Sequence, residues 1–217
     1  MIPTRPAAVI FDMDGLLLDT ERISRTSMIE VVNAMGFPMT EADFAPLVGL
    51  PKDANRKQLD DRFGPGFDYD LMRARQLDLN NRRYGLARPL RPGAREIIDT
   101  VVALGLPRAV ATSTERIKAI SHLTHSGLID AFDIVVTRDD VARGKPFPDL
   151  YLAATAALGV SPAACLALED SYNGVRAAHA AGVPVIMVPD LLPPTDEMRA
   201  MALAVVDDLA VVRRWLE

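Results

Sequence analysis

Short apolar runs rich in β-branched and small residues recur along the chain, with helical patterns between them. We predict six strands from these runs: Ala7–Phe11, Arg108–Ala111, Asp133–Thr137, Cys165–Leu168, Pro184–Val188 and Leu203–Val206. Two of the intervening segments, AREIIDTVVALG and YNGVRAAHAAG, have helical spacing and end at a glycine. Because strands and helices alternate, the pattern predicts an α/β fold whose parallel sheet is covered by helices on both faces.

The interval between Thr20 and Arg91 has a different pattern, with helical periods and no convincing strand. Its helical stretches are RISRTSMIEVVNAMG, DANRKQLDDRF and DLMRARQLDLNNRRYG. We therefore expect an all-helical insertion over residues 20–91 and an α/β core formed by residues 1–19 and 92–217. The insertion is rich in arginine, which we interpret as a solvated surface.

The length and net charge of the chain limit its domain count and the kinds of partner that we expect. The chain has 217 residues, 49% of them hydrophobic, which suffices for one domain with an insertion and a substantial core. A net charge of −5 provides no basic field, so neither nucleic acid nor a membrane is expected as a partner. The N-terminal apolar stretch is too short for a signal peptide, and no stretch approaches the roughly 18 apolar residues of a membrane span. We expect a cytoplasmic protein that acts as a monomer.

The first predicted strand ends in acidic residues, which a buried parallel strand normally excludes. Asp12 and Asp14 follow Phe11 with one residue between them, and Gly15 comes next. Residues two apart in an extended chain point the same way, so both carboxylates could meet at the carboxyl end of the sheet, where ligands bind. The glycine would let the chain turn away sharply. Taken alone, the pattern also fits a loop with two capping aspartates.

A second acidic pair, Glu169-Asp170, ends another predicted strand. Four carboxylates at one sheet edge would repel each other, at a cost on the order of 4 kcal/mol for each close pair at an effective dielectric of about 20. A divalent cation would compensate this charge, and ligands that are all oxygen favour Mg²⁺. Asp170 could instead cap the following helix, a role that Ser171 could also fill.

Two further segments could supply a phosphate site at the same edge. Thr112, Ser113 and Thr114 follow the strand that ends at Ala111, and the next helix would offer free N–H groups to an anion. Lys145 lies in a segment with two prolines and could supply a fixed positive charge. Each feature alone is typical of an ordinary helix cap or a solvated lysine, so the argument depends on their combination.

The cysteine and the histidines show no pattern of a metal site or a nucleophile. Cys165 lies among apolar residues, which indicates a buried structural thiol, and a single cysteine excludes an intramolecular disulfide. His122 and His125 are three apart on a predicted helix, without the further ligands of a zinc site, and His179 lies among alanines. We expect packing or surface roles for all three histidines.

Four motifs in order along the chain resemble the haloacid dehalogenase-like hydrolase superfamily. They are DMDGLLLDTE, ATSTER, GKPFPDLY and LEDSYNGVRAAHAAG, and together they extend over essentially the whole chain. The resemblance is to the branch of small-molecule phosphatases and β-phosphoglucomutase-like proteins, which have a helical cap after the first strand. It implies a Rossmann-like core, an all-helical cap and phosphatase activity. Dehalogenases of this family lack the second aspartate, which this chain has as Asp14.

The resemblance also implies how the acidic residues work. Asp12 would attack phosphorus to form an aspartyl-phosphate, and Asp14 would be the general acid and then the general base. Mg²⁺ would be held by the Asp12 carboxylate, the Asp14 backbone carbonyl and Asp170. Glu169 would either bind the metal directly or contact a residue that does.

The remaining motif residues would bind the phosphate. Thr112 and the N–H of Ser113 would hold phosphate oxygens, and Lys145 would neutralise charge beside the nucleophile. The substrate would be a small phosphorylated metabolite, such as a sugar phosphate. Residues 49–52, Gly-Leu-Pro-Lys, are candidates for a cap loop that approaches the site, although a plain turn between helices fits them equally.

Three other functions share parts of this pattern. A sugar-phosphate mutase of the β-phosphoglucomutase type would grip a second phosphate, but Lys52 and Arg116 are only loosely placed for that. Ser24 also stands where the mutase has a histidine. A phospho-accepting signalling receiver carries its aspartate on the third strand of a shorter chain. A catalytically dead binding protein would be expected to lack a motif residue, and none is missing, so hydrolysis is favoured.

Overall fold

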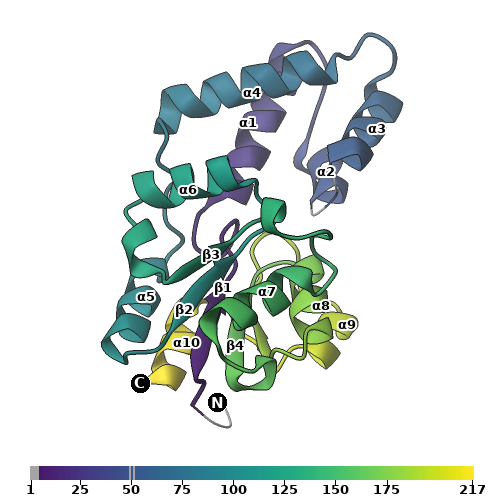
Figure 1. Cartoon of the computed structure of the whole chain (residues 1–217). Helices are drawn as coiled ribbons and strands as arrows, with labels where there is room; N and C mark the ends of the chain where they lie inside the picture. The colour runs from purple at the N-terminus through teal and green to yellow at the C-terminus, as the bar shows by residue number, and fades with distance from the viewer. Residues whose placement is uncertain (1–4, 49, 51) are drawn as a thin grey trace. The chain divides into compact units, whose positions relative to one another are not determined.

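The structure, a computed structural model, describes residues 5–48, 50 and 52–217. In this part of the chain six parallel strands form one sheet in the order β3-β2-β1-β4-β5-β6 (Figure 1). The strands are β1 (Ala8–Phe11), β2 (Arg108–Ala111), β3 (Ile134–Val136), β4 (Cys165–Glu169), β5 (Val185–Met187) and β6 (Ala204–Val205). The predicted fold class is confirmed, and each predicted strand is present with its ends shifted by at most one residue.

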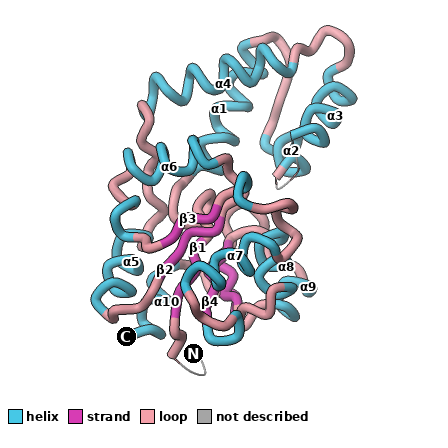
Figure 2. The backbone as a smooth tube through the Cα atoms, in the orientation of Figure 1, coloured by secondary structure: helices cyan, strands magenta, loops and turns pink. Residues whose placement is uncertain are grey.

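Helices connect these strands, and sheet and helices form one unit, Met1–Asp19 with Ala87–Glu217 (Figure 2). The α-helices of this unit are α5 (Ala94–Ala103), α6 (Arg116–His125), α7 (Asp149–Leu158), α8 (Tyr172–Ala180), α9 (Asp196–Met201) and α10 (Leu209–Leu216). Single turns of 3-10 helix occur at η2 (Ile129–Ala131), η3 (Arg138–Asp140) and η4 (Pro162–Ala164).

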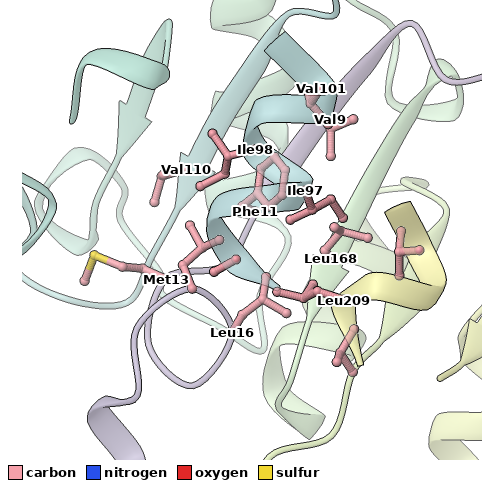
Figure 3. Close-up of a cluster of buried hydrophobic side chains, with 14 of the residues drawn as sticks. Val9, Phe11, Met13, Leu16, Ile97, Ile98, Val101, Val110, Leu168 and Leu209 are labelled. Carbon is pink, nitrogen blue, oxygen red and sulfur yellow. The ribbon is translucent and has the colours of Figure 1, made fainter. Parts of the chain in front are cut away.

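The two faces of the sheet carry separate apolar cores, because alternate residues of a strand point to opposite sides. Val9 and Phe11 of β1 belong to one buried cluster, together with apolar residues of α5, α6 and α10 (Figure 3). Ala8 and Ile10 belong to the other, with residues of α7, α8 and α9. Cys165 lies in this second cluster and is 2% exposed, so the predicted buried thiol is confirmed.

Residues Thr20–Leu86 form a second unit. Its described residues contain helices and no strand: α1 (Thr20–Ala34), α2 (Glu41–Phe44), η1 (Ala45–Leu47), α3 (Lys52–Phe63) and α4 (Tyr69–Tyr84). Buried Gln76 of α4 donates a hydrogen bond to the backbone carbonyl of Ser24 in α1 at 2.9 Å, which joins the two longest helices of the unit. Across the described residues of the whole chain, no helix has the length and hydropathy needed to cross a bilayer.

The two linkers to this helical unit pair with each other. The N–H of Asp19 donates to the carbonyl of Pro89 at 2.8 Å, and the N–H of Arg91 donates to the carbonyl of Leu17 at 2.9 Å. The Arg91 guanidinium also lies 2.9 Å from Asp190 and 3.7 Å from Asp19. These contacts fix both linkers to the unit that contains the sheet, one up to Asp19 and the other from Pro89 onwards.

Candidate active site

The sheet register brings the predicted site residues to one edge. Phe11 of β1 pairs with Val110 of β2 and with Leu168 of β4, so the residues that follow these three emerge side by side. Between β1 and β4 the order of strands along the sheet reverses, and such a switch point is where open α/β sheets bind ligands. The N–H of Asp12 donates to the Leu168 carbonyl at 3.0 Å, which continues the hydrogen-bond ladder one residue beyond β1.

A turn of chain follows Asp12 and carries Asp14. Gly15 has φ of 90°, a conformation that residues with a side chain rarely adopt, and its N–H donates to the Leu18 carbonyl at 2.8 Å. The chain thus reverses directly after Asp14, as the glycine predicts.

Lys145 connects three of the four motifs. Its ammonium group donates hydrogen bonds to the Asp12 carboxylate and, at 2.5 Å, to the Glu169 carboxylate. The Lys145 side chain is 5% exposed, and those of Asp12 and Glu169 are 8% and 0% exposed. The lysine is therefore a buried counter-ion shared by two carboxylates. It is not the solvated surface lysine that the sequence left as an alternative.

The Glu169 carboxylate accepts hydrogen bonds on both oxygens. Oε1 accepts from Lys145 and from the Tyr151 hydroxyl at 2.7 Å. Oε2 accepts from the N–H of Asp170 at 3.2 Å, the N–H of Ser171 at 3.3 Å and the Ser171 hydroxyl at 3.2 Å. A carboxylate offers about four lone-pair sites, so these donors leave Glu169 without spare capacity for a metal.

Burial and crowded charge shift the pKa values in this cluster. Burial raises the pKa of Asp12 well above its usual range, and the charges of Glu169 and Asp14 add to this while Lys145 opposes it. Burial alone would lower the pKa of Lys145, but its contacts with Asp12 and Glu169 raise the net pKa above the usual range, so the lysine stays charged. Burial, followed by the charge of Glu169, raises the pKa of Tyr151, which therefore remains a hydrogen-bond donor.

Asp14 is held by hydroxyl groups that follow β2. The Thr114 hydroxyl donates to Asp14 Oδ2 at 2.7 Å, and the Thr112 hydroxyl lies 3.3 Å from the same oxygen. Thr112 is 1% exposed, whereas Ser113 is exposed and lies at the start of the segment that leads into α6. The structure thus places Thr112 beside the acidic turn.

A divalent cation fits the acidic end of this site. Asp12, Glu169 and Asp170 each offer a carboxylate oxygen, and these atoms lie within 4.8 Å of one another. Hard oxygen donors in a crowded, buried cluster suit Mg²⁺, and the negative charges of Glu169 and Asp14 beside Asp12 would be offset by a cation there. Asp12, Glu169 and Asp170 are therefore the side chains that could hold the ion, and the oxygens of Glu169 already accept hydrogen bonds from protein donors. Among the described residues, this is the only such group, and it contains no histidine.

The structure also bears on two alternatives that the sequence leaves open. Ser171, and not Asp170, caps α8, because its hydroxyl accepts from the N–H of Gly174 at 3.1 Å. Arg116, considered above for a second phosphate, donates to both carboxylate oxygens of Asp140 at 2.6 Å and is engaged in that ion pair. Of the expected cap loop, Gly49 and Pro51 lie outside the described residues.

Sequence reasoning missed several residues around the site. Tyr151 of α7 is the last residue of the GKPFPDLY motif, but the sequence alone predicts no role for it at the site. His122 and Arg88 are also close enough for the charge of Asp14 to raise their pKa values, while burial has the larger, lowering effect on both. His122 is half-buried in α6.

Comparisons with known proteins agree with this arrangement. The family described as haloacid dehalogenase-like hydrolase has a sequence profile that matches residues 9–188. Phosphorylated carbohydrates phosphatase of Thermotoga maritima is 33% identical over 176 residues, which cover 81% of this chain and 82% of that protein. Protein SUPPRESSOR OF QUENCHING 1, chloroplastic, of Arabidopsis thaliana is 37% identical over 193 residues, 84% of this chain, but the chain spans only 18% of its length.

A solved structure shows the same fold. A HAD family hydrolase from Deinococcus radiodurans R1, with bound phosphate and sodium, has a TM-score of 0.83 to this chain at 28% identity. The likeness covers 98% of this chain and 95% of that one.

Proposed function

We propose that this chain, which belongs to the haloacid dehalogenase-like hydrolase family, hydrolyses phosphate monoesters of small metabolites through an aspartyl-phosphate on Asp12. The observation that carries the proposal is the contact of Lys145 with both Asp12 and Glu169, which joins three motifs in one buried cluster. The fourth motif joins it through the hydroxyl of Thr112 near Asp14. A relative named as a phosphatase of phosphorylated carbohydrates supports a sugar phosphate or a similar metabolite as substrate.

In the first step, a carboxylate oxygen of Asp12 attacks phosphorus and the bond from phosphorus to the ester oxygen breaks. The Asp14 carboxyl group gives its proton to the departing alcohol, which leaves as a neutral molecule. Thr112 and the N–H of Ser113 hold the phosphate oxygens, and the buried ammonium of Lys145 balances the negative charge beside Asp12.

In the second step, Asp14 takes a proton from a water molecule, and the resulting hydroxide attacks phosphorus. The bond between phosphorus and the Asp12 oxygen breaks, inorganic phosphate is released, and Asp12 is regenerated as a carboxylate. One residue thus serves as acid and then as base, which restores its protonated form at the end of the cycle.

The proposal includes Mg²⁺ held by the carboxylates of Asp12 and Asp170 together with the backbone carbonyl of Asp14. When bound there, the ion would supply positive charge that keeps Asp12 ionised and offsets the charge of the phosphate. Glu169 has a different part in this scheme: its oxygens accept from Lys145, Tyr151 and the start of α8, so it orients the lysine.

The ion pair between Arg116 and Asp140 favours hydrolysis over the phosphate transfer of a mutase. A mutase must grip the second phosphate of a bisphosphate, but this guanidinium is taken by Asp140. Ser24, in the place of the mutase histidine, has a backbone carbonyl that accepts from Gln76 within the helical unit. We propose that this unit, Thr20–Leu86, is the cap that selects the substrate.

The proposal is tested by release of inorganic phosphate from a panel of sugar, nucleoside and other metabolite phosphates, with and without Mg²⁺. We expect Mg²⁺-dependent release from at least one class. A parallel assay supplies β-glucose 1-phosphate with a trace of the bisphosphate. Isomerisation faster than phosphate release would favour the mutase, and no release from any ester would contradict the phosphatase.

A further inference from the structure

We propose that Thr114 is the positioning residue of the general acid and base Asp14. Its hydroxyl lies 2.7 Å from Asp14 Oδ2, and it is the closest hydrogen-bond donor to that carboxylate in the described part of the chain. Thr112 lies at 3.3 Å from the same oxygen and makes the weaker contact. This inference rests on the proposed function, because it concerns how the proposed proton donor is aimed.

The backbone of Thr114 is fixed on both sides. Its N–H donates to the Thr112 hydroxyl oxygen at 3.0 Å, and its carbonyl accepts from the N–H of Arg138 at 3.1 Å. Because the backbone of Thr114 is fixed, only the rotation of its side chain determines whether its hydroxyl reaches Asp14. A donor prepared in this way orients a carboxylate at little entropic cost.

Thr112 cannot hold Asp14 and a phosphate at the same time. A hydroxyl group has one proton to donate, and in the proposed function Thr112 donates it to a phosphate oxygen. When phosphate binds, the contact from Thr112 to Asp14 is lost and the contact from Thr114 remains. The two threonines thus divide the work, with Thr112 binding the phosphate and Thr114 aiming the carboxylate that moves protons.

The test compares Thr114→Val, which removes the donor but keeps the shape, with Thr114→Ser, which keeps the hydroxyl. The matched control is Thr155→Val, because Thr155 is buried and donates its hydroxyl to the Leu152 carbonyl within α7. Each variant is assayed with p-nitrophenyl phosphate by stopped flow, with an alkyl phosphate in the steady state, and for inhibition by inorganic phosphate.

We expect Thr114→Val to slow steady-state turnover about 10- to 100-fold, as for loss of one hydrogen bond to a charged group. The initial burst of p-nitrophenol should keep its rate, because this leaving group needs no proton, and the inhibition constant of phosphate should not change. Thr114→Ser should recover most of the turnover, and Thr155→Val should resemble the wild type.

Two results would overturn the assignment of Thr114. One is turnover in Thr114→Val equal to that of Thr155→Val. The other is a slower burst together with weaker inhibition by phosphate, which would make Thr114 a phosphate ligand. A wild-type protein that hydrolyses no ester would overturn the proposed function itself, and this inference with it.

Discussion

Replacement of Gly174 by alanine tests whether the Glu169 carboxylate is as fixed as its contacts indicate. A Cβ at position 174 would lie 1.8 Å from Glu169 Cδ and 1.9 and 2.0 Å from its two oxygens. Glu169 has no exposed surface and accepts hydrogen bonds on both oxygens, so it cannot withdraw without breaking them. At an unobstructed position inside a helix, replacing glycine by alanine raises the free energy of unfolding by about 1 kcal/mol. A decrease for Gly174→Ala would therefore report the clash with Glu169.

The expected loss follows from two contributions. Overpacking of a filled site costs about 1–3 kcal/mol, and breaking a buried ion pair costs about 3–5 kcal/mol. We expect Gly174→Ala to lower the free energy of unfolding by about 3 kcal/mol or more. Urea unfolding followed by the fluorescence of Trp215, the single tryptophan of the chain, reports on the unit that contains the sheet.

Gly66→Ala is the control for the substitution itself. Because Gly66 lies in the helical unit and Trp215 in the other, unfolding of both variants is also followed by circular dichroism, which reports on both units. A Cβ at Gly66 would meet only Phe37, at 3.9 Å, and the backbone there is not left-handed. The control should change the free energy of unfolding by less than about 0.5 kcal/mol. If Gly174→Ala were as stable as the wild type, the Glu169 carboxylate would be mobile, and our account of how Lys145 is oriented would be wrong.

Removal of metal by a chelator should abolish phosphate release, and added Mg²⁺ should restore it; full turnover in excess chelator would contradict the proposed cofactor. Asp170→Asn should raise the Mg²⁺ concentration for half-maximal turnover, whereas Glu169→Gln should leave it near that of the wild type, because the Glu169 oxygens are occupied by protein donors. Hydrogen bonds from Arg62 and Thr40 lower the pKa of Asp43 in the helical unit from 3.8 to about 2. Since the folded-state pKa is depressed, Asp43 stabilises this unit above pH 3.8 and loses that contribution as the pH falls through about 2. An NMR titration of its carboxyl carbon should show this midpoint, and a value near 3.8 would count against the capping box at α2.

The strands and most motif residues could be predicted from the sequence because charge at the end of a buried apolar run is rare. Asp12 and Glu169 each follow such a run, and their strands proved to be neighbours in the sheet. The family predicted from the four motifs is confirmed by the profile match over residues 9–188. Asp12 and Glu169 could be predicted as site residues because each stands at the end of the apolar run that forms its own strand.

The contacts within the site were not predictable in the same way. Tyr151 reads as one apolar residue of a helix, and its hydrogen bond to Glu169 depends on how α7 packs against the sheet. Thr114 is one of three consecutive hydroxyl residues, and only the turn after β2 distinguishes its contact with Asp14 from that of Thr112. The steric need for glycine at position 174 likewise arises from the folded path of Glu169.

The central claim is that Asp12 and Asp14, two chemically alike residues, have different tasks, and trapping of the phospho-enzyme tests it most directly. Asp14→Asn keeps the nucleophile but lacks the base, so the intermediate should hydrolyse roughly 10²–10⁴-fold more slowly. After incubation with p-nitrophenyl phosphate and Mg²⁺, mass spectrometry should find one phosphate on the peptide that contains Asp12 in Asp14→Asn, and none in Asp12→Asn. Phosphate on a different residue, or no trapped phosphate in either variant, would contradict the account.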